Sequence, residues 1–202
     1  MSISIFSNRT ESLNAKVAAV TLAVAAFMTL LLSHFSVALA PIRLLTFATA
    51  AFGVWAFCDE MGIAKPLNRA GFVFFAIAAL AKIQLFLGIT NQFIGRYYLL
   101  YSAFLLLAVL FWSVALLHRQ RSLKTVGAIG VAASLLPTAA IVVGHLVLGI
   151  GAAIGLEAIL SATEVNDTTD LSFVILVERI FGLWAYVVAW FLWKGYIKIK
   201  NA

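Results

Sequence analysis

The chain has 202 residues, of which 64% are hydrophobic and 11% charged, whereas a soluble domain has about 45–50% apolar and about 25% charged residues. In water this composition would expose large apolar patches, so it excludes an ordinary soluble domain and predicts a protein embedded in a lipid bilayer. The net charge of +6 does not indicate nucleic-acid binding, because the basic residues lie in short segments between apolar runs.

Six apolar runs, separated by charged residues and turn formers, follow one another along the chain. Each is long enough, or nearly so, to cross about 30 Å of hydrocarbon as a helix that rises about 1.5 Å per residue. They lack the alternation of barrel strands, which leaves helices as the spanning structure. The sequence therefore predicts an all-α, polytopic membrane protein, a six-helix bundle that forms one domain over residues 1–202. The predicted spans are 15–39, 42–58, 70–89, 97–117, 126–153 and 171–193.

The first two spans are expected to form a helical hairpin. The apolar run of the first span is about 24 residues long, which exceeds the apolar part of a typical signal peptide, so we expect it to be retained. Pro41 separates it sharply from the second span, which is the shortest of the six.

Lysine and arginine are distributed unequally between the two sides that these spans define. Ten fall on the side that holds both chain ends, whereas Arg43 and Arg96 fall on the other side, together with an acidic segment around Asp167. Because short loops rich in Lys and Arg stay in the cytoplasm, both termini are predicted to be cytoplasmic. The ten basic residues are Arg9, Lys16, Lys65, Arg69, Arg119, Arg121, Lys124, Lys194, Lys198 and Lys200.

Few polar side chains lie inside the predicted spans, and each charge among them costs at least about 2.5–3.5 kcal/mol at mid-bilayer depth. Counted along each helix from the nearest basic residue on the cytoplasmic side, these side chains lie about 20–31 Å into the membrane. They therefore form a polar layer in the outer half of the membrane, where a small solute, ion or proton can bind. The candidate residues are His34, Lys82, Gln84, His145, Glu178 and Arg179.

Lys82 and Glu178 are the natural partners within this layer. A lone charge in lipid would be neutralised or drawn to the interface, whereas a pair can stay charged. Two interpretations are open: the pair opens when a substrate or proton enters, or it is structural and fixes the packing of spans three and six. Lys82 can also snorkel outward on its long stem. Glu178 and Arg179 are about 100° apart on a helix, so they cannot both face one spot.

The fifth span differs from the others because Pro137 lies near its middle. Proline removes a backbone hydrogen bond there and predicts a kink. Glycines crowd the outer half of the span. They either let a neighbouring helix approach closely or provide a hinge beside a cavity. These glycines are Gly144, Gly149, Gly151 and Gly155.

His34 and His145 raise the alternative of a haem site. Two imidazoles on separate helices at similar depth can ligate one b-type haem iron, although a histidine that bridges two helices is the commoner case. No cofactor is predicted, and haem b is kept as an alternative only. The single cysteine, Cys58, excludes an internal disulfide and a multi-thiolate metal site.

The leading functional hypothesis is a non-enzymatic membrane protein that binds or moves a small solute, ion or proton through the polar layer. Enzymes are disfavoured because the sequence has no Gly-rich phosphate loop, no GxSxG elbow and no HExxH helix. The alternatives are an accessory subunit of a larger membrane complex, or a homo-oligomer, with partners packed on the glycine-rich helices, and a small b-type haem redox protein. The compact chain and its scarce cysteine favour a bacterial inner membrane.

Overall fold

The computed structural model describes residues 9–31, 40–60, 64–86, 94–118, 121–148 and 172–200. Within these ranges every element is an α-helix and none is a strand, which confirms the all-α prediction for the described part of the chain. Three of the helices, α3, α4 and α7, contain stretches long and apolar enough to cross a membrane. The helices are α1 (Arg9–Leu31), α2 (Ala40–Glu60), α3 (Lys65–Phe86), α4 (Ile94–Leu117), α5 (Arg121–Leu148) and α7 (Ser172–Lys200).

Several helices extend beyond the apolar runs from which they were predicted. Helix α3 begins at Lys65, ahead of the predicted 70–89, with Pro66 in its first turn. Proline fits there because the first N–H groups of a helix have no intrahelical partner. The carbonyl of Ala64 accepts the N–H of Leu67 at 2.9 Å and that of Asn68 at 3.2 Å. A charged turn therefore extends this helix rather than ending it, and α5 and α7 likewise include basic residues at their ends.

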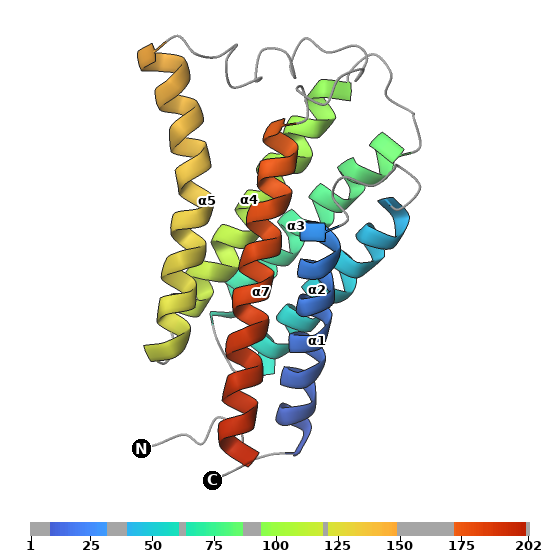
Figure 1. Cartoon of the computed structure of the whole chain (residues 1–202), viewed down its shortest axis with the longest axis vertical. Coiled ribbons are helices and arrows are strands. Elements are labelled where there is room, and N and C mark those ends of the chain that lie inside the picture. The colour runs from blue at the N-terminus through green and yellow to red at the C-terminus, as the bar shows by residue number, and fades with distance from the viewer. Residues whose placement is uncertain are drawn as a thin grey trace.

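Helices that follow one another along the chain pack antiparallel, whereas α4 and α7 run parallel (Figure 1). Contacts join α1 to α2, α2 to α3, α3 to α4 and α4 to α5, while α7 packs on α1, α4 and α5. Position 71 of α3 lies beside Trp112 of α4, and Lys82 lies beside Tyr101, so these two helices run in opposite directions. The beginning of α1 and the end of α7 lie at the same end of the bundle. Helix α7 thus packs on helices from both halves of the chain.

An aromatic core ties four of the helices together. Trp112 of α4 is fully buried and stacks on Trp184 of α7, with ring centroids 5.7 Å apart and an interplanar angle of 15°. Phe181 lies 6.0 Å from Trp184 and meets the ring of Phe47 edge-on at 4.9 Å. Such offset and edge contacts are the arrangements that aromatic quadrupoles favour. The aromatic core consists of Phe47, Phe75, Trp112, Phe181 and Trp184.

The outer surface of the bundle is also apolar. Large hydrophobic side chains are exposed on every helix that the structure describes, and the most exposed of them are 57–68% accessible. A soluble bundle would place polar residues on these faces. Lipid tails are the solvent that suits them. The most exposed are Phe27, Leu45, Phe52, Leu80 and Leu136.

Replacing Gly127 by alanine is expected to destabilise the bundle by about 1–3 kcal/mol, the usual cost of overpacking. A Cβ at this position of α5 would lie 2.6 Å from the carbonyl oxygen of Ser113 and 2.8 Å from the backbone nitrogen of Leu117. Because both atoms belong to the α4 backbone, α5 has to move away to make room. Unfolding of the purified protein by sodium dodecyl sulfate measures the loss.

Gly182→Ala on α7 is the matched control for this substitution. Its added Cβ would meet the side chains of Thr29 and Leu30 at 3.1–3.3 Å, and these can shift by small rotations. Both variants gain the same helix propensity of about 1 kcal/mol over glycine. Gly127→Ala should therefore be clearly the less stable, and equal stability of the two would contradict a backbone contact between α4 and α5.

Candidate functional site

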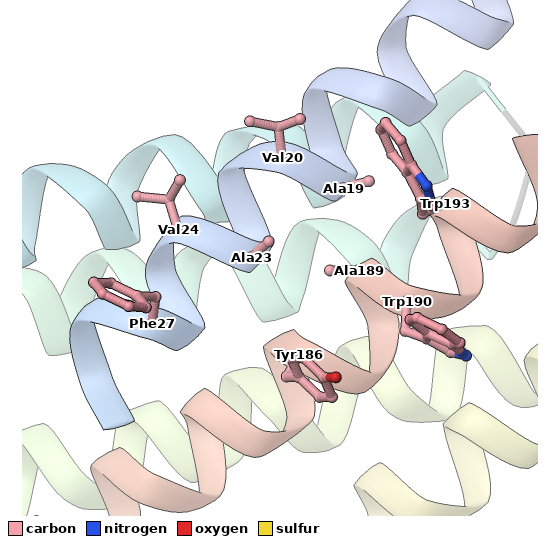
Figure 2. Close-up of a pocket in the computed structure, with 9 residues that line it drawn as sticks. All are labelled: Ala19, Val20, Ala23, Val24, Phe27, Tyr186, Ala189, Trp190 and Trp193. Carbon is pink, nitrogen blue, oxygen red and sulfur yellow. The ribbon is translucent and has the colours of Figure 1, made fainter. Parts of the chain in front are cut away.

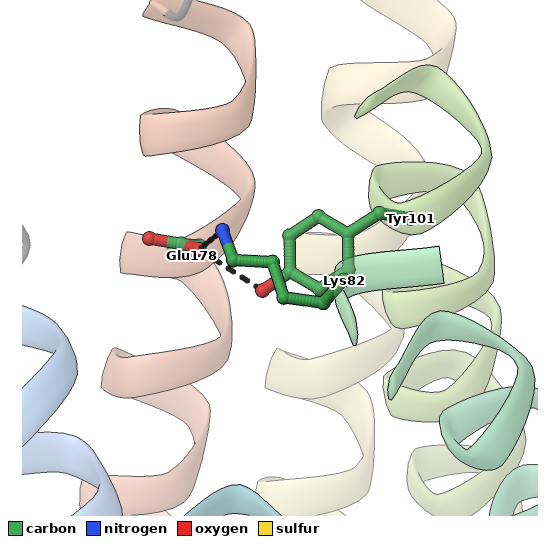
Figure 3. Close-up of polar contacts among 3 residues, drawn as sticks. All are labelled: Lys82, Tyr101 and Glu178. Atoms are coloured by element: carbon green, nitrogen blue, oxygen red, sulfur yellow. Dashed lines mark hydrogen bonds and ion pairs between the residues drawn. The ribbon is translucent and has the colours of Figure 1, made fainter. Parts of the chain in front are cut away.

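The structure brings Lys82 and Glu178 together in an ion pair (Figure 3). The Nζ atom of Lys82 on α3 lies 3.0 Å from Oε1 of Glu178 on α7, which is within hydrogen-bond distance. The Glu178 side chain is 5% exposed and that of Lys82 17% exposed. A carboxylate so deeply buried needs a partner of opposite charge, because burial of an unpaired charge is strongly unfavourable.

Tyr101 completes the pair from a third helix, α4. Its hydroxyl donates a hydrogen bond to the same Oε1 atom of Glu178 at 3.0 Å, and the residue is 2% exposed. The ammonium of Lys82 also lies over the Tyr101 ring, 4.6 Å from its centroid, and 5.8 Å from the centroid of the Tyr98 ring. We call Lys82, Tyr98, Tyr101 and Glu178 the ammonium site.

The two tyrosines are not among the site residues that were predicted from the sequence. A signal for Tyr101 exists in the antiparallel hairpin of α3 and α4. Position 71 faces Trp112 and Lys82 faces Tyr101, so residues at equal distances from the connection lie side by side. The predicted spans 70–89 and 97–117 are joined by a short connection, but the rotation of each helix decides which of several tyrosines faces inward.

The position of Glu178 follows from the pattern of α7. Buried residues recur on one face of this helix at the spacing of helical turns, and Glu178 takes a place on that face. Arg179, the next residue, is exposed, as expected for neighbours about 100° apart. The buried residues of this face are Val174, Val177, Phe181, Trp184, Ala185 and Val188.

Of the other predicted site residues, the structure describes the positions of some. Gln84 is exposed near the end of α3. His145 and Gly144 lie on α5, which continues through Pro137 to Leu148. The other predicted residues lie outside the described part of the chain, namely His34, Gly149, Gly151 and Gly155. Haem ligation by His34 and His145, kept above as an alternative only, therefore stays untested. Among the described residues, no three His, Cys, Asp or Glu side chains gather in a metal-binding cluster.

The aromatic core lies next to the ammonium site, on the side toward the beginning of α1 and the end of α7. Along α7, Glu178 is followed by Phe181 and Trp184, and along α4, Tyr101 is followed by Trp112. These aromatic side chains are at most 3% exposed. The charged groups are thus separated from one end of the bundle by close-packed rings.

An apolar groove of about 450 Å³ lies between α1 and α7 (Figure 2). Alanines form part of its lining, and larger side chains, including Phe27, Tyr186 and Trp190, stand along it. The lining offers almost no polar group to hold a charged solute, so the groove is chemically distinct from the ammonium site. Its residues are Ala19, Val20, Ala23, Val24, Phe27, Tyr186, Ala189, Trp190 and Trp193.

The ammonium site holds a carboxylate, an ammonium and a phenol within hydrogen-bond or ring contact of one another. A carboxylate, an ammonium and a phenol can exchange hydrogen-bond partners or a proton. Comparisons with protein families, with curated proteins and with solved structures give no match to this chain.

Proposed function

We propose that the chain is a non-enzymatic membrane protein that binds or moves a small solute, ion or proton at the ammonium site. The observation that carries the proposal is the Lys82–Glu178 pair, 3.0 Å apart, with the carboxylate 5% exposed. The two residues lie on helices long and apolar enough to cross a membrane. Ionisable residues inside spanning helices are costly, and they commonly mark pathways for ions and substrates.

The proposed topology has six spans with both ends in the cytoplasm of a bacterial cell, which puts the ammonium site in the outer half of the inner membrane. The excess of basic residues on the side of the chain ends supports this orientation. In the empty state, Lys82 and Glu178 neutralise each other, and the aromatic core closes the cytoplasmic side. A solute or proton that enters from outside competes for one of the two charges. Helix α5, which packs on α4 and α7 and contains Pro137, is the element proposed to move.

Charge displacement in proteoliposomes tests this proposal. The wild-type protein, adsorbed on a solid-supported membrane, is exposed to jumps of pH and to a panel of small cations, anions and zwitterions. At least one jump should evoke a current that Lys82→Ala and Glu178→Ala each reduce at least about tenfold, because the proposed cycle needs the pair both to open and to form again. Size-exclusion profiles of the variants establish that they are folded.

Gln84→Ala is the matched control, because Gln84 lies on the same helix as Lys82 and is exposed. Its current should equal that of the wild type. A current that survives in folded Glu178→Ala protein, or no current for any jump, would contradict transport through the ammonium site.

An accessory subunit of a larger complex is the second candidate function, and the groove between α1 and α7 favours it. Small residues such as Ala19 and Ala189 let a partner helix approach closely in lipid, where such packing drives association. Native mass spectrometry of the protein, extracted from its own host in mild detergent, distinguishes the candidates. Additional chains in a fixed ratio support the proposal that the protein is a subunit of a complex. A monomer or homo-oligomer without other chains favours the proposal of solute binding or transport. A bound mass equal to that of haem would support the redox alternative.

A further inference from the structure

Three electron-rich groups lie around the ammonium of Lys82 in the described structure. Glu178 provides a carboxylate oxygen at 3.0 Å. Tyr101 and Tyr98 present ring faces, with centroids at 4.6 and 5.8 Å. A carboxylate together with aromatic faces is the combination that recognises an ammonium ion, because the negative charge and the ring quadrupoles both attract it.

The carboxylate is the fixed member of the pair and the ammonium is the movable one. Glu178 is buried on α7, and its Oε1 atom is also held by the hydroxyl of Tyr101 at 3.0 Å. Lys82 is more exposed, with 17% of its side chain accessible, and it lies one turn before the end of α3 at Phe86. A lysine so near a helix end can extend its stem and carry the ammonium to the interface. Movement of Lys82 would leave a cation site behind, with its carboxylate and both rings in place.

We infer that the solute of the ammonium site is a small organic ammonium ion, which takes the place that the Lys82 ammonium occupies in this structure. Lys82 then acts as a tethered competitor that keeps Glu178 neutralised while the site is empty. This inference rests on the proposed function and narrows it to one class of substrate.

Anionic solutes fit the same geometry poorly. An anion could only bind to the ammonium of Lys82, and it would have to separate that group from Glu178. The buried carboxylate would then keep its negative charge without the ammonium that neutralises it in this structure, which is strongly unfavourable. Like-charge repulsion between the anion and Glu178 further disfavours the binding of anions.

Equilibrium dialysis of radiolabelled methylammonium against purified protein tests the inference. Lys82→Met removes the tethered competitor and keeps an unbranched apolar stem of similar length. This variant should bind methylammonium at least about tenfold more tightly than the wild type, because the ligand no longer has to displace an ammonium group. Methylammonium binding should be lost in Lys82→Met/Glu178→Gln, which keeps the shape of the site without the charge. Radiolabelled acetate should not bind to any of the three proteins.

A second measurement on the wild-type protein avoids dependence on the variant. Tetramethylammonium chloride should raise the rate at which an acylating reagent modifies Lys82, as mapped by peptide mass spectrometry, because the displaced side chain becomes accessible. Exposed Lys65 serves as the internal reference, and sodium chloride at equal ionic strength is the control. An increase of at least about threefold at Lys82 alone supports displacement, whereas equal rates in the two salts overturn it.

The outcomes separate this inference from the proposed function. Acetate binding, or methylammonium binding that persists without the Glu178 charge, overturns the cation assignment. A Glu178-dependent current evoked only by anions overturns it too, while transport through the site stands. Methylammonium binding that depends on Glu178, without any current, supports the cation site and contradicts the proposal that the protein transports its solute.

Discussion

Lys82→Met and Glu178→Leu are each expected to lose about 3–5 kcal/mol of stability, whereas the double variant Lys82→Met/Glu178→Leu should recover most of that loss. Each single change leaves a charge without its partner, and in Lys82→Met that charge is the buried carboxylate. The double change replaces the pair by apolar groups of similar volume, which is often neutral for stability. The free energy of unfolding in sodium dodecyl sulfate, measured for all four proteins, gives the coupling between the two residues.

The two single variants should not be equally unstable. In Glu178→Leu, the free ammonium of Lys82 can extend toward the interface, because the side chain is long and lies near the end of α3. In Lys82→Met, Glu178 is too short and too deeply buried to reach water. Lys82→Met is therefore expected to be the less stable variant. A coupling energy near zero would contradict an ion pair in the membrane.

The double variant also distinguishes a structural pair from a functional one. A pair that only fixes the packing of α3 and α7 can be replaced by apolar residues with little further consequence. A pair that exchanges with a solute cannot, because the double variant has no carboxylate to receive a cation. Recovery of stability without recovery of methylammonium binding or current is the result expected for the ammonium site.

The parts of the site that could be predicted from sequence are those that depend on depth alone. Lys82 and Glu178 lie at similar heights in their spans, and opposite charges at one height in lipid have a strong reason to meet. The all-helical fold follows from long apolar runs in the same way. Neither prediction requires knowledge of how the helices are rotated about their axes.

The features that could not be predicted depend on helix rotation and close packing. Gln84 and Arg179 are at the same depth as the pair but point outward. Tyr101 contributes its hydroxyl and its ring only because α4 turns this residue, rather than another tyrosine, toward α7. The contact of Gly127 with the α4 backbone arises likewise from the fit of two surfaces. Because all faces of these helices are apolar, hydrophobic periodicity gives little information on rotation.

Trp112→Ala is expected to reduce the free energy of unfolding by about 3 kcal/mol, at the lower end of the range for a buried aromatic residue. The lower end applies because lipid solvates the helices after they separate, so the loss comes mainly from the cavity and from missing contacts. Trp112 is fully buried and stacks on Trp184, and its Nε1 donates to the carbonyl oxygen of Asn68 at 3.3 Å. Unfolding by sodium dodecyl sulfate measures this loss as well.

Two further variants test whether the Trp112 ring contributes more to stability than the adjacent Phe111 ring. Phe111→Ala removes the adjacent ring, which is half-buried and contacts Phe74 of α3. This change should reduce the free energy of unfolding by less than half as much as Trp112→Ala. Trp112→Phe keeps a ring in the core and should recover more than half of the stability. If Phe111→Ala proves as damaging as Trp112→Ala, the aromatic core is not what joins α3, α4 and α7. The ammonium site would then need another support, because each of these three helices contributes charged or aromatic groups to it.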